Sequence, residues 1–264
     1  MSVSIQVDHV TKEFTMLYHR TLKQKAVAAA RRLPLQEKFL AVNDVSFTVE
    51  QGESVGLMGL NGSGKSTLLK VINGVMRPDK GEVLTRGRIA GLIATGAGFQ
   101  AQLSGRENLF LNGAILGMSE AETRRKFDDI VEFAGLGKFL DTPVSHYSSG
   151  MYARLGFSIA IHVDADIFLA DEVLAVGDKP FKKKCMEKMQ EIRRQGTTIF
   201  YVSHAAASVR AMCDRILVLE SGHLNYDSKV VEGGSVDGGI RYLQYDDDED
   251  GEELGLDEEL GADV

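Results

Sequence analysis

Nine consecutive residues decide the fold of this chain: Gly59-Leu60-Asn61-Gly62-Ser63-Gly64-Lys65-Ser66-Thr67. They match the phosphate-binding pattern G-x-x-x-x-G-K-[ST] in full. The apolar run 54–58 before them predicts a buried strand, and residues 68–72 continue at helical spacing. Glycine-rich backbone between a strand and a helix can turn its N–H groups toward phosphate oxygens. The stretch therefore predicts a nucleoside triphosphate site, where Lys65 meets the β- and γ-phosphates and Ser66 ligates Mg²⁺.

A second stretch, residues 166–172, supplies the acids that such a site needs. Its apolar run ends in Asp171 and Glu172, and open α/β sheets present their ligands at the carboxyl ends of the strands. We expect Asp171 to hold Mg²⁺ through water opposite Ser66, and Glu172 to orient and deprotonate the water that attacks the γ-phosphate. Helix capping is the alternative interpretation of an Asp-Glu pair after an apolar run.

The rest of the chain fits around these two stretches. Alternating residues at 4–10 and 45–49 predict an antiparallel edge sheet, and between them residues 18–38 are basic and partly helical. That basic segment is either a solvated surface helix or an element that faces a membrane or a partner. Residues 77–89 carry the turn chemistry of a hairpin, and residues 91–108 form a glycine-rich loop.

A helical insertion follows, and then further buried strands. Helical periodicity covers residues 107–139, where Ser119 and Glu122 predict a capping box, and helix resumes at Ser149. Buried strands at 165–172, 197–204 and 215–224 alternate with helices, which predicts a mainly parallel sheet. We therefore expect an α/β domain over residues 1–240 with a helical subdomain inserted at about 100–160.

Composition and charge indicate where the chain is located in the cell and what its C-terminal segment looks like. The net charge of −8 arises in residues 246–264, which hold eleven acids and no base, so residues 241–264 are expected to form a disordered acidic tail. No apolar run of bilayer length and no export signal occurs, which predicts a cytosolic chain. Cys185 and Cys213 lack metal-ligand spacing and are expected to be ordinary reduced thiols.

Residues 146–160, HYSSGMYARLGFSIA, resemble the signature motif of ATP-binding cassette (ABC) proteins. Ser148, Gly150 and Arg154 match that motif, whereas Tyr147, Ser149 and Met151 depart from it. The opening of a helix at Ser148, Ser149 and Gly150 could hold a γ-phosphate at its positive end.

The resemblance implies roles for further residues. Asp178 corresponds to the acid of the D-loop, and His204 to the switch histidine that contacts the γ-phosphate. Phe14 fits the adenine-stacking aromatic, with Tyr18 as the alternative. Where most cassettes carry a glutamine before the helical insertion, this chain has Ala94-Thr95-Gly96, with Gln100 and Gln102 later in the loop.

The departures resemble a subfamily, the ATP-binding subunits of Wzm/Wzt-type exporters of lipid-linked polysaccharides and teichoic acids. The resemblance implies a homodimer of ATPase subunits on the cytoplasmic face of the membrane, paired with two copies of a separate transmembrane permease and with no nucleic acid partner. The glycine-rich loop 96–106 carries two apolar residues, Phe99 and Leu103, and we expect it and the insertion that begins at Glu107 to receive the permease. Local packing of both residues under the loop is the alternative. A soluble cassette ATPase of the translation or DNA-repair type, or an importer ATPase, is the alternative function.

Overall fold

The computed structural model describes residues 2–17, 36–92, 98–171 and 178–243. In chain order the described elements are β1 (Val3–Leu17), β2 (Gln36–Glu50), β3 (Ser54–Met58), α2 (Lys65–Ile72), β4 (Lys80–Thr85), β5 (Ile89–Leu92), α3 (Gly105–Ile115), α4 (Glu120–Ala134), the 3₁₀ turns Gly137–Phe139 and Val144–His146, α5 (Ser149–Ile161), β6 (Ile167–Ala170), α6 (Lys179–Arg194), β7 (Thr198–Val202), α7 (Ala206–Met212), β8 (Arg215–Glu220) and β9 (His223–Asp227). Strands and helices alternate from α5 to β8, whereas strands predominate before that part and helices α3 to α5 follow one another.

A six-stranded sheet in the order β5-β6-β7-β3-β8-β9 forms the centre of the molecule. Its neighbours pair in parallel except β8 and β9, and every residue of β3, β6 and β7 is buried. Strands covered on both faces need apolar residues throughout, which explains runs such as Ile167–Ala170. The mainly parallel sheet predicted from sequence is confirmed.

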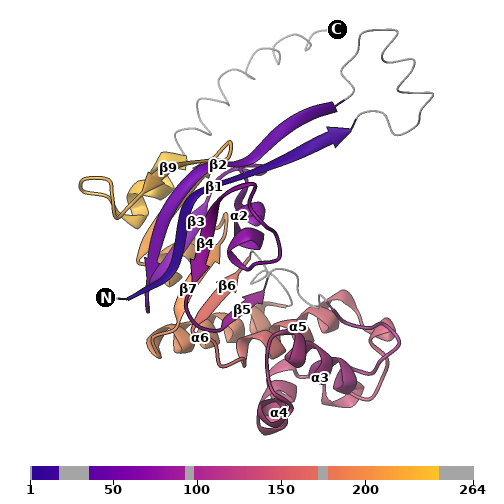
Figure 1. The fold of residues 1–264 in the computed structure, drawn as a ribbon. Coiled ribbons are helices and arrows are strands. Elements are labelled where there is room, and N and C mark those ends of the chain that lie inside the picture. Colours follow the sequence, from indigo (N-terminus) through magenta and orange to yellow (C-terminus); the bar gives the residue numbers. More distant parts are fainter. Residues whose placement is uncertain (1, 18–35, 93–97, 172–177, 244–264) are drawn as a thin grey trace, which may run out of the picture.

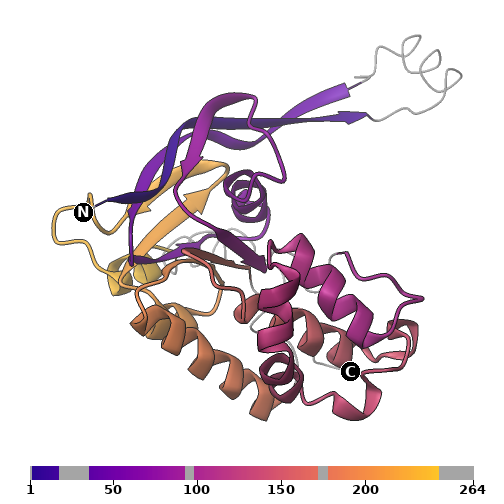
Figure 2. The same cartoon turned by 60° about the horizontal axis from the view of Figure 1, so that its bottom comes forward.

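A second, three-stranded antiparallel sheet has the order β2-β1-β4 and confirms the predicted edge sheet. Its strands are longer than the alternating segments suggested. β4 pairs with β1 no further than Thr11, whereas β1 and β2 stay paired to Leu17 and Gln36. Beyond Thr11 the two strands therefore continue as a ribbon whose end projects from the body, and we call residues 13–17 and 36–40 the arm (Figures 1 and 2). Of the predicted basic segment, residues 18–35 lie outside the described residues.

The predicted hairpin at residues 77–89 is wrong. β4 pairs with β1 in the antiparallel sheet, whereas β5 pairs with β6 in the parallel sheet, and the chain crosses between the two sheets at residues 86–88. Gly87 has φ 103° at this crossing, and a Cβ there would lie 2.5 Å from the side chain of Asp166. The alternating pattern of β5, with Ala90 and Leu92 buried, suits the edge of the central sheet. Consequently Gly91 and Leu92 belong to a strand and not to the glycine-rich loop.

The segment 215–224 is not one strand but the first part of a hairpin. Ser221 and Gly222 both have positive φ, 46° and 83°, and they connect β8 to β9 in the antiparallel pair. Two central residues with positive φ match the right-handed twist of the strands that they join. The alternation of His223–Asp227 was the sequence signal for the second strand.

The helical insertion is confirmed, with different caps. Helix α3 begins at Gly105, two residues earlier than predicted, because Ser104 and Glu107 form a complete capping box. At α4 the predicted box is half formed. Ser119 accepts from the N–H of Glu122, but the Glu122 carboxylate accepts from Arg88 Nη1 at 2.9 Å and from the N–H of Asp164 at 3.3 Å. A buried carboxylate binds a guanidinium more strongly than it binds a neutral backbone N–H.

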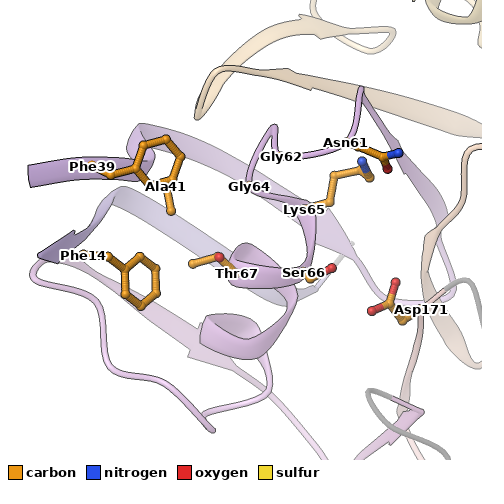
Figure 3. Close-up of a pocket in the computed structure, with 10 residues that line it drawn as sticks. All are labelled: Phe14, Phe39, Ala41, Asn61, Gly62, Gly64, Lys65, Ser66, Thr67 and Asp171. Carbon is orange, nitrogen blue, oxygen red and sulfur yellow. The ribbon is translucent and has the colours of Figure 1, made fainter. Parts of the chain in front are cut away.

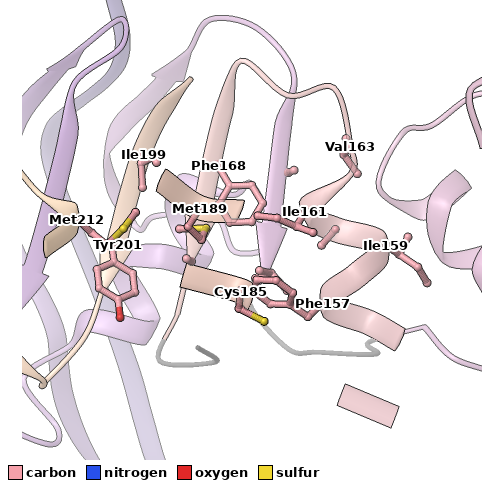
Figure 4. Packing of buried hydrophobic residues seen from close by; sticks show 14 of the residues in the cluster. Phe157, Ile159, Ile161, Val163, Phe168, Cys185, Met189, Ile199, Tyr201 and Met212 are labelled. Atoms are coloured by element: carbon pink, nitrogen blue, oxygen red, sulfur yellow. The ribbon is translucent and has the colours of Figure 1, made fainter. Parts of the chain in front are cut away.

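The larger core lies between the parallel sheet and helices α5, α6 and α7 (Figure 4). Phe157 from α5, Phe168 from β6 and Tyr201 from β7 are almost fully buried there. A second core lies between the two sheets and α2. Both cysteines are buried, which raises the pKa of each thiol to about 12 and leaves it protonated, as expected of reduced thiols without chemistry.

The described part of the chain ends inside the body. Residues 236–243 are helical, and Ile240 and Leu243 are buried in the larger core. Residues 244–264, which include the predicted acidic tail, lie outside the described residues. Within the described ranges, no helix has the length and apolarity needed to cross a membrane.

Candidate nucleotide site

The phosphate loop connects the end of β3 to the start of α2, as predicted. Gly59, Gly62 and Gly64 all have positive φ, at 151°, 86° and 106°. A Cβ on Gly59 would lie 2.1 Å from the carbonyl oxygen of Leu219, and one on Gly64 would lie 2.0 Å from that of Ala41. Both positions therefore accept glycine alone, whereas Gly62 faces open space.

Lys65 is the first residue of α2 and is 7% exposed. Its ammonium donates to the carbonyl oxygens of Gly59 at 2.7 Å and Leu60 at 2.8 Å, which holds the charge over the loop. Ser66 and Thr67 follow in the first turn, which carries no acidic residue and no side-chain cap. The first turn of α2 thus keeps its positive end for an anion.

A cavity of about 300 Å³ lies beside the loop (Figure 3). It combines residues from both sheets, the loop and the first turn of α2. Its lining consists of Phe14, Phe39, Ala41, Asn61, Gly62, Gly64, Lys65, Ser66, Thr67 and Asp171. The structure therefore brings together the predicted aromatic, the phosphate loop and the acid that follows β6.

The lining fits a nucleotide and a hard cation. Within the loop, although not in the lining itself, the Ser63 hydroxyl is buried, and no residue that the structure describes accepts from it or donates to it. Ser66 and Asp171 offer a hydroxyl and a carboxylate to the same cavity, which are oxygen ligands of the kind that Mg²⁺ takes. In the described ranges no three His, Cys, Asp or Glu residues gather for a metal, so the nucleotide and water would supply the remaining ligands.

Of the two predicted catalytic residues, the structure describes one. Glu172 lies outside the described residues. His204 is the second residue after β7 and is exposed. Since β7 lies between β6 and β3 in the sheet, its carboxyl end is flanked by Asp171 on one side and by the phosphate loop on the other. His204 does not belong to the lining of the cavity.

The signature residues lie apart from this cavity, at the start of α5. Ser148 caps the helix by accepting from the N–H of Met151 at 3.2 Å, and both Ser148 and Ser149 are exposed. A Cβ on Gly150 would approach only the Ser148 hydroxyl, at 3.9 Å. This helix start is therefore open to a ligand from outside the protomer.

Asp178 caps α6 and pairs with the signature helix. Its carboxylate accepts from the N–H of Phe181 at 3.3 Å and from Arg154 Nη2 at 2.6 Å. Desolvation raises the pKa of Asp178, but the hydrogen bonds from Phe181 and Arg154 outweigh it and hold the pKa below its ordinary value. The sequence indicated both residues but not their contact.

The sequence analysis missed two residues of the lining, of which one is Ala41 and the other is the aromatic Phe39. Phe39 lies opposite Phe14 in the β1–β2 register and is 45% exposed. In the sequence, Phe39 is visible as an aromatic residue shortly before the predicted strand 45–49. Its position in the cavity depends on the cross-strand register, which cannot be read from the sequence.

Comparison with known proteins agrees with this geometry. The family model described as ABC transporter matches residues 42–175. The O-antigen export system ATP-binding protein RfbB of Klebsiella pneumoniae is 44% identical over 224 residues, covering 83% of this chain and 91% of that protein. The teichoic acids export ATP-binding protein TagH of Bacillus anthracis is 43% identical over 224 residues, covering 85% of this chain and 40% of that protein.

Solved structures share the fold. An ATP-binding cassette determined as a dimer in a post-hydrolysis state with ADP and Pi superposes with a TM-score of 0.68 at 23% identity, covering 86% of this chain and 99% of that one. The ATP-binding subunit of an ABC transporter gives 0.71 at 23% identity, covering 91% and 99%. The resemblance inferred from the motifs is confirmed, and the chain belongs to the ABC transporter family.

Proposed function

We propose that this chain is the ATP-hydrolysing subunit of an ABC transporter that exports a lipid-linked polysaccharide or polyol phosphate across the cytoplasmic membrane. The observation that carries the proposal is the cavity in which the phosphate loop, Ser66 and Asp171 face one another. The names of the relatives, O-antigen export and teichoic acids export ATP-binding proteins, support the class of cargo.

Lys65 and the loop backbone bind the triphosphate. On binding, the Lys65 ammonium exchanges its two carbonyl acceptors for phosphate oxygens, which carry more negative charge. Phe14 stacks on the adenine, with Tyr18 as the alternative outside the described residues. Ser66 and Asp171 would hold Mg²⁺, which supplies charge neutralisation at the phosphates when it is bound.

Glu172 and His204 complete the chemistry. Glu172 follows Asp171 directly and accepts a proton from the attacking water, and His204 donates to the γ-phosphate. Asp171, the residue before Glu172, and His204 follow the neighbouring parallel strands β6 and β7 and therefore lie at the same edge of the sheet.

A second copy of the chain supplies the remaining contacts. Ser148, Ser149 and Gly150 are not among the residues that line the cavity of their own protomer, and in a head-to-tail homodimer they and Asp178 would close over the ATP of the partner. Two permease subunits with membrane-spanning helices would sit above this dimer at the cytoplasmic membrane surface.

Nucleotide titration of Lys65→Ala and Asp171→Asn tests the site. Loss of a charge-assisted contact should weaken ATP binding by roughly ten- to a hundredfold in Lys65→Ala. Asp171→Asn should instead reduce the gain in affinity that added Mg²⁺ produces. Unchanged ATP affinity in Lys65→Ala would remove the nucleotide site from this cavity.

The export role has its own test. The chain should co-purify with the product of a neighbouring reading frame that encodes about six apolar spans of some 20 residues each. Lipid analysis of that complex should identify a polyprenyl-linked or lipid-linked glycan. A complex that carries a solute-binding partner would favour the importer alternative.

A further inference from the structure

The arm places two aromatic rings at one end of the nucleotide cavity. Phe14 on β1 and Phe39 on β2 are cross-strand partners in the antiparallel register, so both side chains leave the same face of the ribbon. Both line the cavity, and Figure 3 shows them at the end that is far from Asp171, with Thr67 beside them.

Neither ring is part of a core. Phe14 is 37% exposed and Phe39 is 45% exposed, although neighbouring β-residues such as Val42 and Val45 are fully buried. Two large aromatic side chains that stay exposed to water do not contribute the stabilising free energy that their burial would give to the fold. Aromatic surface kept open on the wall of a cavity suits a flat, apolar ligand group that covers it.

The Phe14 ring lies near a lysine of its own strand. The Lys12 ammonium lies 5.8 Å from the centroid of the Phe14 ring, and it donates to Asp79 at 3.2 Å. Asp79 also accepts from the N–H of Glu13 at 2.7 Å, which fixes the backbone beside Phe14. Lys12 thus lies within cation–π range of the Phe14 ring.

We propose that Phe39 is a second aromatic contact for the base of the bound nucleotide, made from β2 while Phe14 makes the first from β1. The inference rests on the proposed nucleotide site and adds a base-positioning residue to it. The distance along the cavity supports it, since the rings lie at the opposite end from Asp171, where the phosphates would be. Ala41 and Thr67 line the cavity too, and neither has an aromatic ring on which a base could stack.

Binding of ATP and of inorganic tripolyphosphate to the full chain tests this role, because tripolyphosphate has no base to stack. Stacking of a base on an aromatic side chain is sequence-tolerant and is lost on truncation to alanine. We expect Phe39→Ala to weaken ATP binding by roughly tenfold and to leave tripolyphosphate binding unchanged. Phe39→Tyr should keep the affinity for ATP.

Two further variants separate stacking from packing of the arm. Phe39→Leu keeps apolar bulk without a π-face, so it should lose ATP affinity as Phe39→Ala does while its melting temperature stays at the wild-type value. Met16→Ala removes another side chain of the arm that is also 45% exposed but does not line the cavity. It should bind ATP normally.

Three results would overturn the inference. They are wild-type ATP affinity in Phe39→Ala, an equal loss for ATP and tripolyphosphate, or wild-type ATP affinity in Phe39→Leu alongside a loss in Phe39→Ala. Failure of the nucleotide site itself is recognised separately, because Lys65→Ala would then leave tripolyphosphate binding unchanged.

Discussion

Arg154 Nη2 lies 2.6 Å from Asp178 Oδ1, and this ion pair joins the signature helix α5 to the residue that caps α6. The guanidinium also lies 5.0 Å from the centroid of the Phe181 ring. One carboxylate therefore caps a helix and fixes the position of an arginine six residues after Ser148. The start of α5 and the start of α6 are held as one unit within the protomer.

Asp178→Asn removes the charge of this ion pair and keeps the helix cap, because asparagine caps a helix as well as aspartate does. We expect normal folding and ATP binding, with ATP turnover lowered roughly threefold or more because the signature turn and Asp178 are no longer held together. Turnover of Arg154→Met and of the double variant completes a mutant cycle. Additive losses in that cycle would show that the two residues act independently.

Glu172→Gln should abolish turnover and preserve ATP binding, because the amide keeps the shape of the side chain but cannot accept the proton of the attacking water. The expected loss is roughly a hundred- to ten-thousandfold in kcat. Size-exclusion chromatography with ATP should show a stable dimer, and Glu172→Asp serves as the charge-retaining control. Hydrolysis at the wild-type rate would remove Glu172 from the role of base.

The loop before α3 is the surface where we expect the permease to bind. Its two apolar residues, Phe99 and Leu103, differ in their contacts and are therefore considered one at a time. Phe99 packs edge-to-face on Tyr152 of α5 at 4.8 Å, which favours the interpretation of local packing for this residue. The loop is also braced, since the buried Asn108 accepts from the N–H of Gln100 and donates to the carbonyl oxygen of Leu103.

Leu103→Asp is therefore the sharper variant. We expect it to fold and bind ATP but to lose co-purification with the membrane subunit, because an unpaired charge is not tolerated in an apolar interface. Phe99→Asp should lower the melting temperature instead. Full coupling of ATPase activity in Leu103→Asp would place the docking surface elsewhere on the helical insertion.

Glu122 makes stability depend on pH at the joint between the helical insertion and the central sheet. Burial raises the pKa of its carboxyl, but hydrogen bonds from Arg88 and Asp164 and the charge of Lys126 outweigh burial, so the pKa falls below the ordinary 4.5. A lowered folded-state pKa means that the stabilisation is complete above about pH 4.5 and is lost as pH falls through the folded-state pKa.

Glu122→Gln should consequently reduce the free energy of unfolding by about 1.5–3 kcal/mol at pH 7, the contribution of a charge-assisted hydrogen bond. The difference from wild type should shrink as the pH falls below 4.5. Urea unfolding at pH 7, 5 and 4 measures it, with Glu120→Gln as the control because Glu120 pairs only with exposed Arg124. A difference that grows toward pH 4 would contradict this assignment.

The sequence alone predicted those parts of the site whose residues are adjacent in the chain. Nine adjacent residues specify the phosphate loop, and a buried strand that ends in an acid identified Asp171 on the far side of the cavity. Strand pairing between segments that are distant in the chain was harder to predict from the sequence. The residues of β4 and β5 suit a hairpin locally, yet β5 gains a partner in β6, which lies more than 70 residues later. Phe39 and the Arg154–Asp178 pair depend on register and tertiary contact in the same way, since neither has a local signature.

The exposed turn at Ser148 has a consequence for genetics. If each ATP is held by Lys65 of one copy and Ser148 of the other, a Lys65→Ala chain and a chain with a bulky residue at Gly150 are each inert alone. A mixed pair of the two still contains one intact site, made from the undamaged half of each. Strains that carry both alleles should therefore recover part of the export that neither allele supports alone, whereas two alleles damaged in the same half should not.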